Sequence, residues 1–255
     1  MTSTARESLS VLIMVRNEAD NLEALLPDVA RVLHEAGYAH EVIVVDAASS
    51  DGSEAVARRH GAKVIQQTHP GYANALRQGL AACTGDAILT LDADMSHRPL
   101  FMIDLLAQRH RAGIVIASRY VEGGGADMPM TRLVLSRILN TMFGRLLGIE
   151  VRDMSSGFRL YDRGLVQSLE PRGEHFDVLP EIVVLALAGG HRAIEVPFHY
   201  HPRDAGVSKA RALAFSPSYA RTLARCMAAR WRGRRGSTEI TEPQRSQSRK
   251  SQKPL

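Results

Sequence analysis

Residues 86–99 read Asp-Ala-Ile-Leu-Thr-Leu-Asp-Ala-Asp-Met-Ser-His-Arg-Pro, a short apolar run that ends in two carboxylates one residue apart. Residues 87–91 have the length and composition of a buried strand. If the chain stays extended to Asp94, the two-residue period of a strand places Asp92 and Asp94 on one face. Two such carboxylates raise each other's pKa, and Mg²⁺ or Mn²⁺ between them keeps both ionised. The alternative is an ordinary acidic loop, and the rest of the sequence must decide between the two interpretations.

The length and composition suit one folded domain with tails. The chain has 255 residues, 45% of them hydrophobic, so it can bury a substantial core. It contains no uncharged apolar run of about 18 residues, as a membrane-spanning helix requires. Residues 1–8 also lack the apolar core and cleavage site of a signal peptide. We therefore expect a protein that stays inside the cell.

The cysteines and histidines form no metal-ligand pattern in the sequence. Cys83 and Cys226 lie far apart, which indicates neither a disulfide framework nor a zinc site. His199 and His201 alternate along a predicted strand, but no third ligand stands near them at metal-site spacing. We interpret these two as structural or surface histidines.

Apolar strands and helices alternate through the first 92 residues. The predicted strands are residues 10–15, 41–45, 63–66 and 87–91, and a helical pattern follows each of the first three. This β-α-β order predicts an α/β fold with parallel strands and right-handed crossovers.

Acidic residues follow three of these strand ends. Glu18 comes after the first strand, Asp46 after the second, and Asp92 with Asp94 after the fourth. In open sheets of this kind, ligands bind beyond the carboxyl ends of the strands. The convergence of these acids favours a nucleotide-plus-metal site over unrelated acidic loops.

Several segments together resemble the motifs of family 2 glycosyltransferases in their order and approximate spacing. These segments are residues 11–18, 42–52, 91–99, 118–125 and 156–161. Within that family the chain is similar, over residues 9–210, to the polyprenyl-phosphate sugar synthases of the dolichol-phosphate mannose synthase group. The resemblance implies a GT-A fold, which is a Rossmann-like α/β fold with a mostly parallel central sheet flanked by helices. It also implies a nucleotide-sugar donor and inversion at the anomeric carbon.

The resemblance also implies roles for the acidic residues. Glu18 and Asp46 would hold the nucleoside, although Glu18 could instead be a helix N-terminal charge and Asp46 a turn residue. Asp94 would ligate Mg²⁺ or Mn²⁺ at the donor phosphates, with Asp92 supporting the metal or the ribose. The cation would neutralise charge on the departing diphosphate. Lys209, in a segment similar to the family's closing loop, would touch a donor or acceptor phosphate.

The same resemblance implies an acceptor site. Its predicted members are Arg119, Arg132, Ser156 and Arg159, with Arg159 also counted among the catalytic residues. Guanidinium groups match phosphate oxygens in two-point geometry. Ordinary ion pairs are the alternative for the arginines, and a helix or turn cap is the alternative for the serine hydroxyl. The triple glycine at residues 123–125 would let the acceptor loop approach a phosphate and close on it, and a simple flexible turn is the alternative.

The acceptor decides whether a general base is needed. A hydroxyl acceptor must lose its proton, which calls for a positioned carboxylate such as Glu181 or Asp153. A lipid monophosphate is already ionised at neutral pH, with a second pKa of about 6. For that acceptor, positioning and charge balance suffice.

Two amphipathic segments indicate contact with a membrane surface. Residues 133–147 form a broad apolar helical face, either packed on the domain or partly facing lipid. Residues 213–235 form a helix with an apolar, aromatic-edged face backed by arginines, which suits an anionic membrane surface. Packing within the protein or a dimer, and nucleic-acid binding, are the alternatives. Residues 236–255 are polar and predicted to be disordered.

The sequence therefore predicts a tail at residues 1–8, a GT-A domain at 9–210, a basic helix at 211–235 and a disordered tail at 236–255. The expected activity is inverting, metal-dependent transfer of a mannose- or glucose-type sugar from a GDP- or UDP-sugar to a polyprenyl phosphate. The expected location is the cytoplasm, peripheral at the inner membrane face. Transfer to a hydroxyl of a glycan or secondary metabolite is the first alternative, and a non-catalytic nucleotide-sugar or nucleic-acid binder is the second. Nucleic acid is not an expected partner, and a homo-oligomer is left open.

Overall fold

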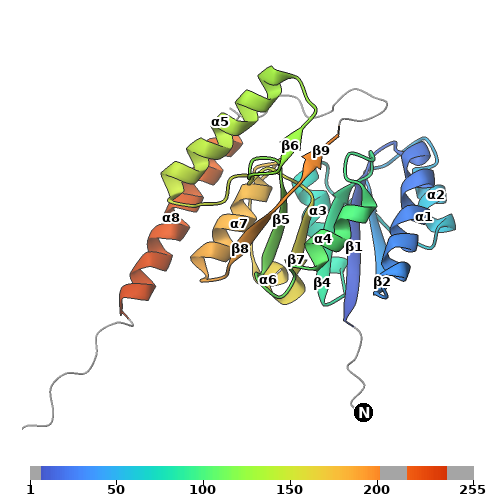
Figure 1. The fold of residues 1–255 in the computed structure, drawn as a ribbon, viewed down its shortest axis with the longest axis horizontal. Coiled ribbons are helices and arrows are strands. Elements are labelled where there is room, and N and C mark those ends of the chain that lie inside the picture. Colours follow the sequence, from blue (N-terminus) through green and yellow to red (C-terminus); the bar gives the residue numbers. More distant parts are fainter. Residues whose placement is uncertain (1–6, 202–216, 240–255) are drawn as a thin grey trace, which may run out of the picture.

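The computed structural model describes residues 7–201 and 217–239 (Figure 1). Its strands are β1 (Ser8–Val15), β2 (Ala39–Asp46), β3 (Lys63–Gln66), β4 (Ala87–Asp92), β5 (Ile114–Ser118), β6 (Gly125–Ala126), β7 (Arg159–Asp162), β8 (Ala193–Pro197) and β9 (His199–Tyr200). Its helices are α1 (Ala19–Glu35), α2 (Ser53–Arg59), α3 (Tyr72–Ala82), α4 (Met102–Leu106), α5 (Met130–Leu147), α6 (Arg163–Ser168), α7 (Val178–Ala188) and α8 (Pro217–Glu239), with a 3₁₀ turn η1 (Pro99–Phe101).

A seven-stranded sheet forms the centre of the molecule, in the order β3-β2-β1-β4-β7-β5-β8. The strand pairs are parallel except that β7 runs antiparallel to both β4 and β5. The four strands predicted for the first 92 residues are all present, with helices on the crossovers between them. The prediction of a mostly parallel α/β fold is confirmed.

Each face of the sheet carries its own hydrophobic core. Along β1, Val11 and Ile13 point to the core beneath α1, while Leu12 between them points to the core beneath α3. All three side chains are fully buried, as expected for a central parallel strand covered by helices on both faces. The sheet is therefore held rigidly, and the loops at its carboxyl edge start from fixed positions.

Two short strands form a second, parallel sheet, β6 with β9. Gly125 pairs with His199 and Ala126 with Tyr200. The ladder continues at both ends, where Gly125 N donates to Phe198 O (3.1 Å) and Asp127 N donates to Tyr200 O (2.9 Å). This ladder ties the segment after the triple glycine to the chain that follows β8.

The C-terminal helix α8 packs against α7 and beside α5 (Figure 1). Ser218 and Thr222 each donate to Asp177 Oδ2 at 2.6 Å, and Cys226 is buried in the core. The first half of α8 is thus packed within the protein, one of the alternatives stated above for this helix. The helix ends at Glu239, and residues 240–255 of the tail predicted to be disordered lie outside the described residues.

A helix that crosses a membrane must be both long and apolar. Within residues 7–201 and 217–239, no helix combines the length and apolarity needed to cross a bilayer.

Candidate active site

Two acidic residues flank the end of the central strand β1. The parallel registers pair Val15 with Asp46 on one side and Met14 with Asp92 on the other. Glu18 follows the same strand and occupies the N-cap position of α1. The sheet topology therefore gathers the acids that the sequence places after separate strands.

Hydrogen bonds join the loops after β1 and β2. Ala19 N donates to Asp51 Oδ2 (2.9 Å), Glu18 N to Ser53 Oγ (2.9 Å) and Ser50 N to Asn17 Oδ1 (2.9 Å). Sequence reasoning missed these supporting residues, although the Ser-Asp-Gly turn at 50–52 was part of the resemblance. These bonds tie the loop that carries Glu18 to the loop that follows Asp46.

Asp46 is almost completely buried in this frame, at 2% exposure. Its carboxylate accepts hydrogen bonds from Ser49 N (3.1 Å) and from the Ser49 hydroxyl. Glu18 accepts a hydrogen bond from Asn21 Nδ2 at 2.6 Å. Both carboxylates are held in position by short-range partners, so their loop geometry is well defined.

The chain turns directly after Asp92. Strand β4 ends at that residue, Ala93 and Asp94 form a turn, and Met95 has a positive φ of 60°. The condition that the strand extends to Asp94 is therefore not met, and a turn rather than the strand period sets where Asp94 lies. Asp94 is 5% exposed and accepts from Ser96 N (3.2 Å) and the Ser96 hydroxyl.

His97 supports this turn from inside the protein, a role that sequence reasoning missed. Asp92 N donates to His97 Nδ1 (2.9 Å), so the neutral ring carries its proton on Nε2, which lies 3.8 Å from Asp92 Oδ2. The ring stacks on Phe158 with centroids 4.7 Å apart. Burial lowers the pKa of His97 against the opposing effect of Asp92 and Asp94. His97 therefore positions Asp92 as a neutral ring at neutral pH.

Arg119 and Asp153 form a buried two-point ion pair. Arg119 Nε lies 2.7 Å from Asp153 Oδ2, and Nη2 lies 2.8 Å from Oδ1. Burial alone would raise the pKa of Asp153, but the Arg119 charge and hydrogen bonds outweigh it and lower that pKa. A carboxylate with a lowered pKa and these partners is a poor general base. The structure thus disagrees with a catalytic base at Asp153. It also shows that the Arg119 guanidinium, predicted to bind a phosphate, is bound in two-point geometry by Asp153.

Arg159 is fully buried rather than open to a ligand. Nη1 donates to Leu179 O (2.8 Å), and Nη2 donates to Met154 O (2.6 Å). This placement conflicts with a role in touching the acceptor phosphate, because the side chain is fully buried and both Nη atoms donate to backbone carbonyls. Arg159 instead connects β7 with the loop at Met154 and the start of α7.

Glu181 is also buried and committed to structure. Oε2 accepts from Arg172 N (2.8 Å) and Gly173 N (2.6 Å), and Oε1 accepts from Arg225 Nε (2.9 Å). These bonds fasten the loop before α7 and the helix α8 to one carboxylate. The prediction of a base at Glu181 conflicts with this arrangement, since neither oxygen faces an open site.

Of the three remaining predicted residues, the structure describes the side chain of Ser156 alone. Ser156 is 6% exposed, and its Oγ accepts from Phe158 N at 3.3 Å, as a turn cap would. Arg132 lies within α5, but its side chain is outside what the structure describes. Lys209 lies in the segment 202–216, also outside the described residues.

The fold and these edge acids define the general class, a Rossmann-like α/β protein with a polar site at the carboxyl edge of its sheet. The family model for glycosyl transferase family 2 matches residues 10–169. Dolichol-phosphate mannosyltransferase from Pyrococcus furiosus is 31% identical over 235 residues, covering 88% of this chain and 64% of that protein. Polyprenol monophosphomannose synthase from Mycolicibacterium smegmatis is 31% identical over 221 residues, covering 78% of this chain and 79% of that protein.

Solved structures share the fold. Glucosyl-3-phosphoglycerate synthase from Mycobacterium tuberculosis, in complex with Mn²⁺, UDP and glucosyl-3-phosphoglycerate, has a TM-score of 0.66 at 23% identity. That match covers 88% of this chain and 80% of the other. The same synthase with phosphoglyceric acid has a TM-score of 0.68 at 22% identity, covering 87% and 80%.

The chain belongs to glycosyl transferase family 2 and is a glycosyltransferase with a GT-A fold. The family, fold and enzyme class predicted from the sequence are confirmed. The chain spans 64% of the length of the Pyrococcus protein, so what that whole protein acts on is a matter of proposal here.

Proposed function

We propose that this glycosyltransferase moves a mannose- or glucose-type sugar from a GDP- or UDP-sugar to a polyprenyl phosphate, with inversion. The observation that carries the proposal is that Asp153 and Glu181 are both buried and bound to protein groups. With both predicted bases committed, an acceptor that is already ionised fits the site better than a hydroxyl. The two relatives named for polyprenol and dolichol phosphate support the same acceptor.

The donor would lie over the end of β1. Asp46 and Glu18 would bind the nucleoside, and Asp92 with Asp94 would hold Mg²⁺ or Mn²⁺ at the diphosphate. Carboxylate oxygens are the ligands that both cations prefer. When bound, the cation stabilises negative charge on the leaving diphosphate. The Mn²⁺ and UDP bound in the fold neighbour are consistent with this role.

The acceptor phosphate would lie beyond the donor, near Ser156 and the loop that starts at Arg119. Arg119 retains 13% side-chain exposure while paired with Asp153, so the pair presents a fixed guanidinium edge rather than a free fork. Arg132 and Lys209 complete the proposed set of phosphate ligands. Arg159 acts in this proposal as a positioning residue, because its bonds to Met154 O and Leu179 O hold the segment that contains Ser156.

The helix α5 supports a lipid acceptor. Five large apolar side chains are exposed along it at four-residue spacing, and we call them the α5 ridge: Met130, Val134, Ile138, Met142 and Leu146. Phe143 and Leu147 on the same helix are buried at 5% and 4% exposure, so packing on the domain accounts only for the other face. An exposed apolar ridge of this kind marks an interaction surface.

We propose that the ridge rests on an anionic membrane surface. Arg137 and Arg145 are exposed on the same helix, and Met227 and Trp231 are exposed on the neighbouring α8. Apolar and aromatic side chains beside arginines suit the interface of an anionic bilayer. The enzyme would then meet its lipid acceptor from the membrane surface, at the inner face.

A transfer assay tests the activity. The protein is incubated with Mg²⁺ or Mn²⁺, labelled GDP-mannose or UDP-glucose, and a short polyprenyl phosphate, and the products are partitioned between organic solvent and water. The proposal predicts label in the lipid phase from one donor, absent in the Asp94→Asn variant. Label that moves only to water-soluble hydroxyl acceptors would overturn the lipid acceptor while leaving the enzyme class intact.

A further inference from the structure

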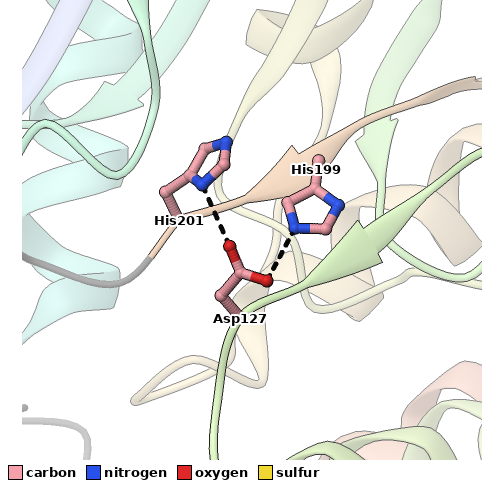
Figure 2. A group of neighbouring side chains, drawn as sticks. All are labelled: Asp127, His199 and His201. Carbon is pink, nitrogen blue, oxygen red and sulfur yellow. Dashed lines mark hydrogen bonds and ion pairs between the residues drawn. The ribbon is translucent and has the colours of Figure 1, made fainter.

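Asp127, His199 and His201 form a compact cluster at the small β6–β9 sheet (Figure 2). Asp127 Oδ1 lies 2.9 Å from His199 Nε2, and Asp127 Oδ2 lies 3.1 Å from His201 Nδ1. The carboxylate therefore faces both imidazole rings. The interpretation of these histidines as lacking a third partner is wrong, because the partner stands more than 70 residues away in the sequence.

The backbone explains why the three side chains meet. His199 and His201 are two residues apart, so the strand period puts both rings on one side of the chain. The ladder then brings Asp127 alongside, through its N–H bond to Tyr200 O. Gly125 leaves room for the ring of His199, since a Cβ at this glycine would lie 2.6 Å from His199 Nδ1.

We propose that Asp127, His199 and His201 bind a divalent transition-metal ion, with Zn²⁺ as the expected class. Two imidazole nitrogens and one carboxylate oxygen are a donor set that Zn²⁺ takes in proteins, with further positions left for water or a ligand. The three ligand atoms all lie within 4.8 Å of one another. Bonds of about 2 Å in a tetrahedral site need about 3.3 Å between ligand atoms.

Small rotations of these side chains would bring their ligand atoms from within 4.8 Å of one another to the separation of about 3.3 Å that a tetrahedral site needs. His199, His201 and Asp127 are 49%, 42% and 56% exposed, so their rings and carboxylate can turn without disturbing a packed core. The strands beneath them are fixed by the β6–β9 ladder. The site is therefore rigid in its backbone and adjustable in its side chains.

This site differs from the Asp92 and Asp94 pair in its chemistry. Carboxylates alone suit Mg²⁺ and Mn²⁺, whereas imidazole nitrogens suit Zn²⁺ and its neighbours in the first transition row. A cation held by Asp127 and the two histidines would join the segment after the triple glycine to the end of β9. It would stiffen the loop at residues 119–129, and its binding does not depend on the proposed lipid acceptor.

Co²⁺ binding tests the proposal, because Co²⁺ replaces Zn²⁺ in such sites and absorbs visible light. The full chain, free of any affinity tag, is titrated with Co²⁺ in excess Mg²⁺, which occupies oxygen-only sites. We expect one equivalent of Co²⁺ to bind with a visible absorption band that Zn²⁺ displaces. The His199→Ala/His201→Ala variant should bind at least about 10–100-fold more weakly, or lose the band entirely.

Two controls separate this site from others. The Asp94→Asn variant should keep the band, since it alters only the carboxylate pair at β4. The His110→Ala/His191→Ala variant removes two exposed histidines elsewhere and should also keep it. Far-UV circular dichroism melts confirm that each variant is folded. Equal Co²⁺ affinity in the wild type and the His199→Ala/His201→Ala variant would overturn the proposal, as would a wild type that shows no band.

Discussion

Arg119 and Asp153 face each other in a buried two-point ion pair, with Nε to Oδ2 at 2.7 Å and Nη2 to Oδ1 at 2.8 Å. Asp153 also accepts from Arg119 N (3.1 Å) and Ser156 N (3.1 Å), so one fully buried carboxylate organises the start of the loop at residues 119–129 and the Ser156 turn. The pair that sequence reasoning split into a phosphate ligand and a general base is one structural unit.

Removing one partner of this pair should destabilise the fold. Asp153→Asn leaves the Arg119 charge without its partner, and breaking a buried pair costs about 3–5 kcal/mol. Urea unfolding measures the loss. Glu54→Gln is the control, because the exposed Glu54–Arg58 pair contributes no more than about 1 kcal/mol. Equal free energies of unfolding for the two variants would contradict the structural role of Asp153.

Asp94→Asn should remove sugar transfer and leave the fold intact. Asparagine keeps an acceptor for Ser96 N, so we expect the free energy of unfolding to change by about 1 kcal/mol at most. Loss of the proposed metal ligand should lower the transfer rate about 100-fold or more. The exposed Asp104, changed to Asn, serves as the control with normal transfer. Near-normal turnover of Asp94→Asn would reject the proposed metal site.

His97 should make the stability of the protein depend on pH. Its folded-state pKa is lowered by burial, so the unfolded chain takes up a proton at a higher pH than the native protein. The contribution of His97 to the free energy of unfolding is therefore fully present above the unfolded-state pKa of about 6.5. It is lost progressively as the pH falls below that value. Unfolding measured at pH 7.5 and at pH 5.5 checks the effect.

The comparison uses His97→Gln, which cannot titrate in this range. The wild type should lose more stability on acidification than this variant, and the difference isolates His97 from the other nine histidines. An equal loss in both proteins would mean that the pKa of His97 is not lowered by folding.

The α5 ridge should mediate binding to anionic membranes. Replacing Ile138 and Leu146 by Gln removes two apolar side chains that are each 56% exposed, so vesicle binding should fall while unfolding changes by about 0.5 kcal/mol or less per site. Co-sedimentation with phosphatidylserine-rich vesicles measures binding. Leu100→Gln is the matched control, since Leu100 is 69% exposed but lies outside this helix. A similar loss for Leu100→Gln, or none for the ridge variant, would contradict the proposal.

Local pattern in the sequence was enough for the first four strands of the sheet and for the acids that directly follow them. Alternating apolar runs and helical periods report directly on residues that are near one another in the chain, so β1 to β4 and α1 to α3 were predictable. Asp46 and Asp92 follow strands that neighbour β1, and parallel topology brings them together. The family motifs in the same segments also predicted the enzyme class.

Side-chain partners from distant segments were decided by tertiary structure alone. Arg159 and Glu181 look like free charges in the sequence, yet β7, the loop before α7 and α8 close around them. Asp127 meets His199 and His201 only because the β6–β9 ladder joins two segments that the sequence separates. Periodicity carries information about neighbours along the chain, whereas these contacts depend on the packing of the whole domain. The sequence by itself therefore determined the fold class and the edge of the sheet at which Asp46 and Asp92 lie. The tertiary structure decided the position of Asp94 and the partners of the buried charges, because both depend on turns and contacts that no local pattern encodes.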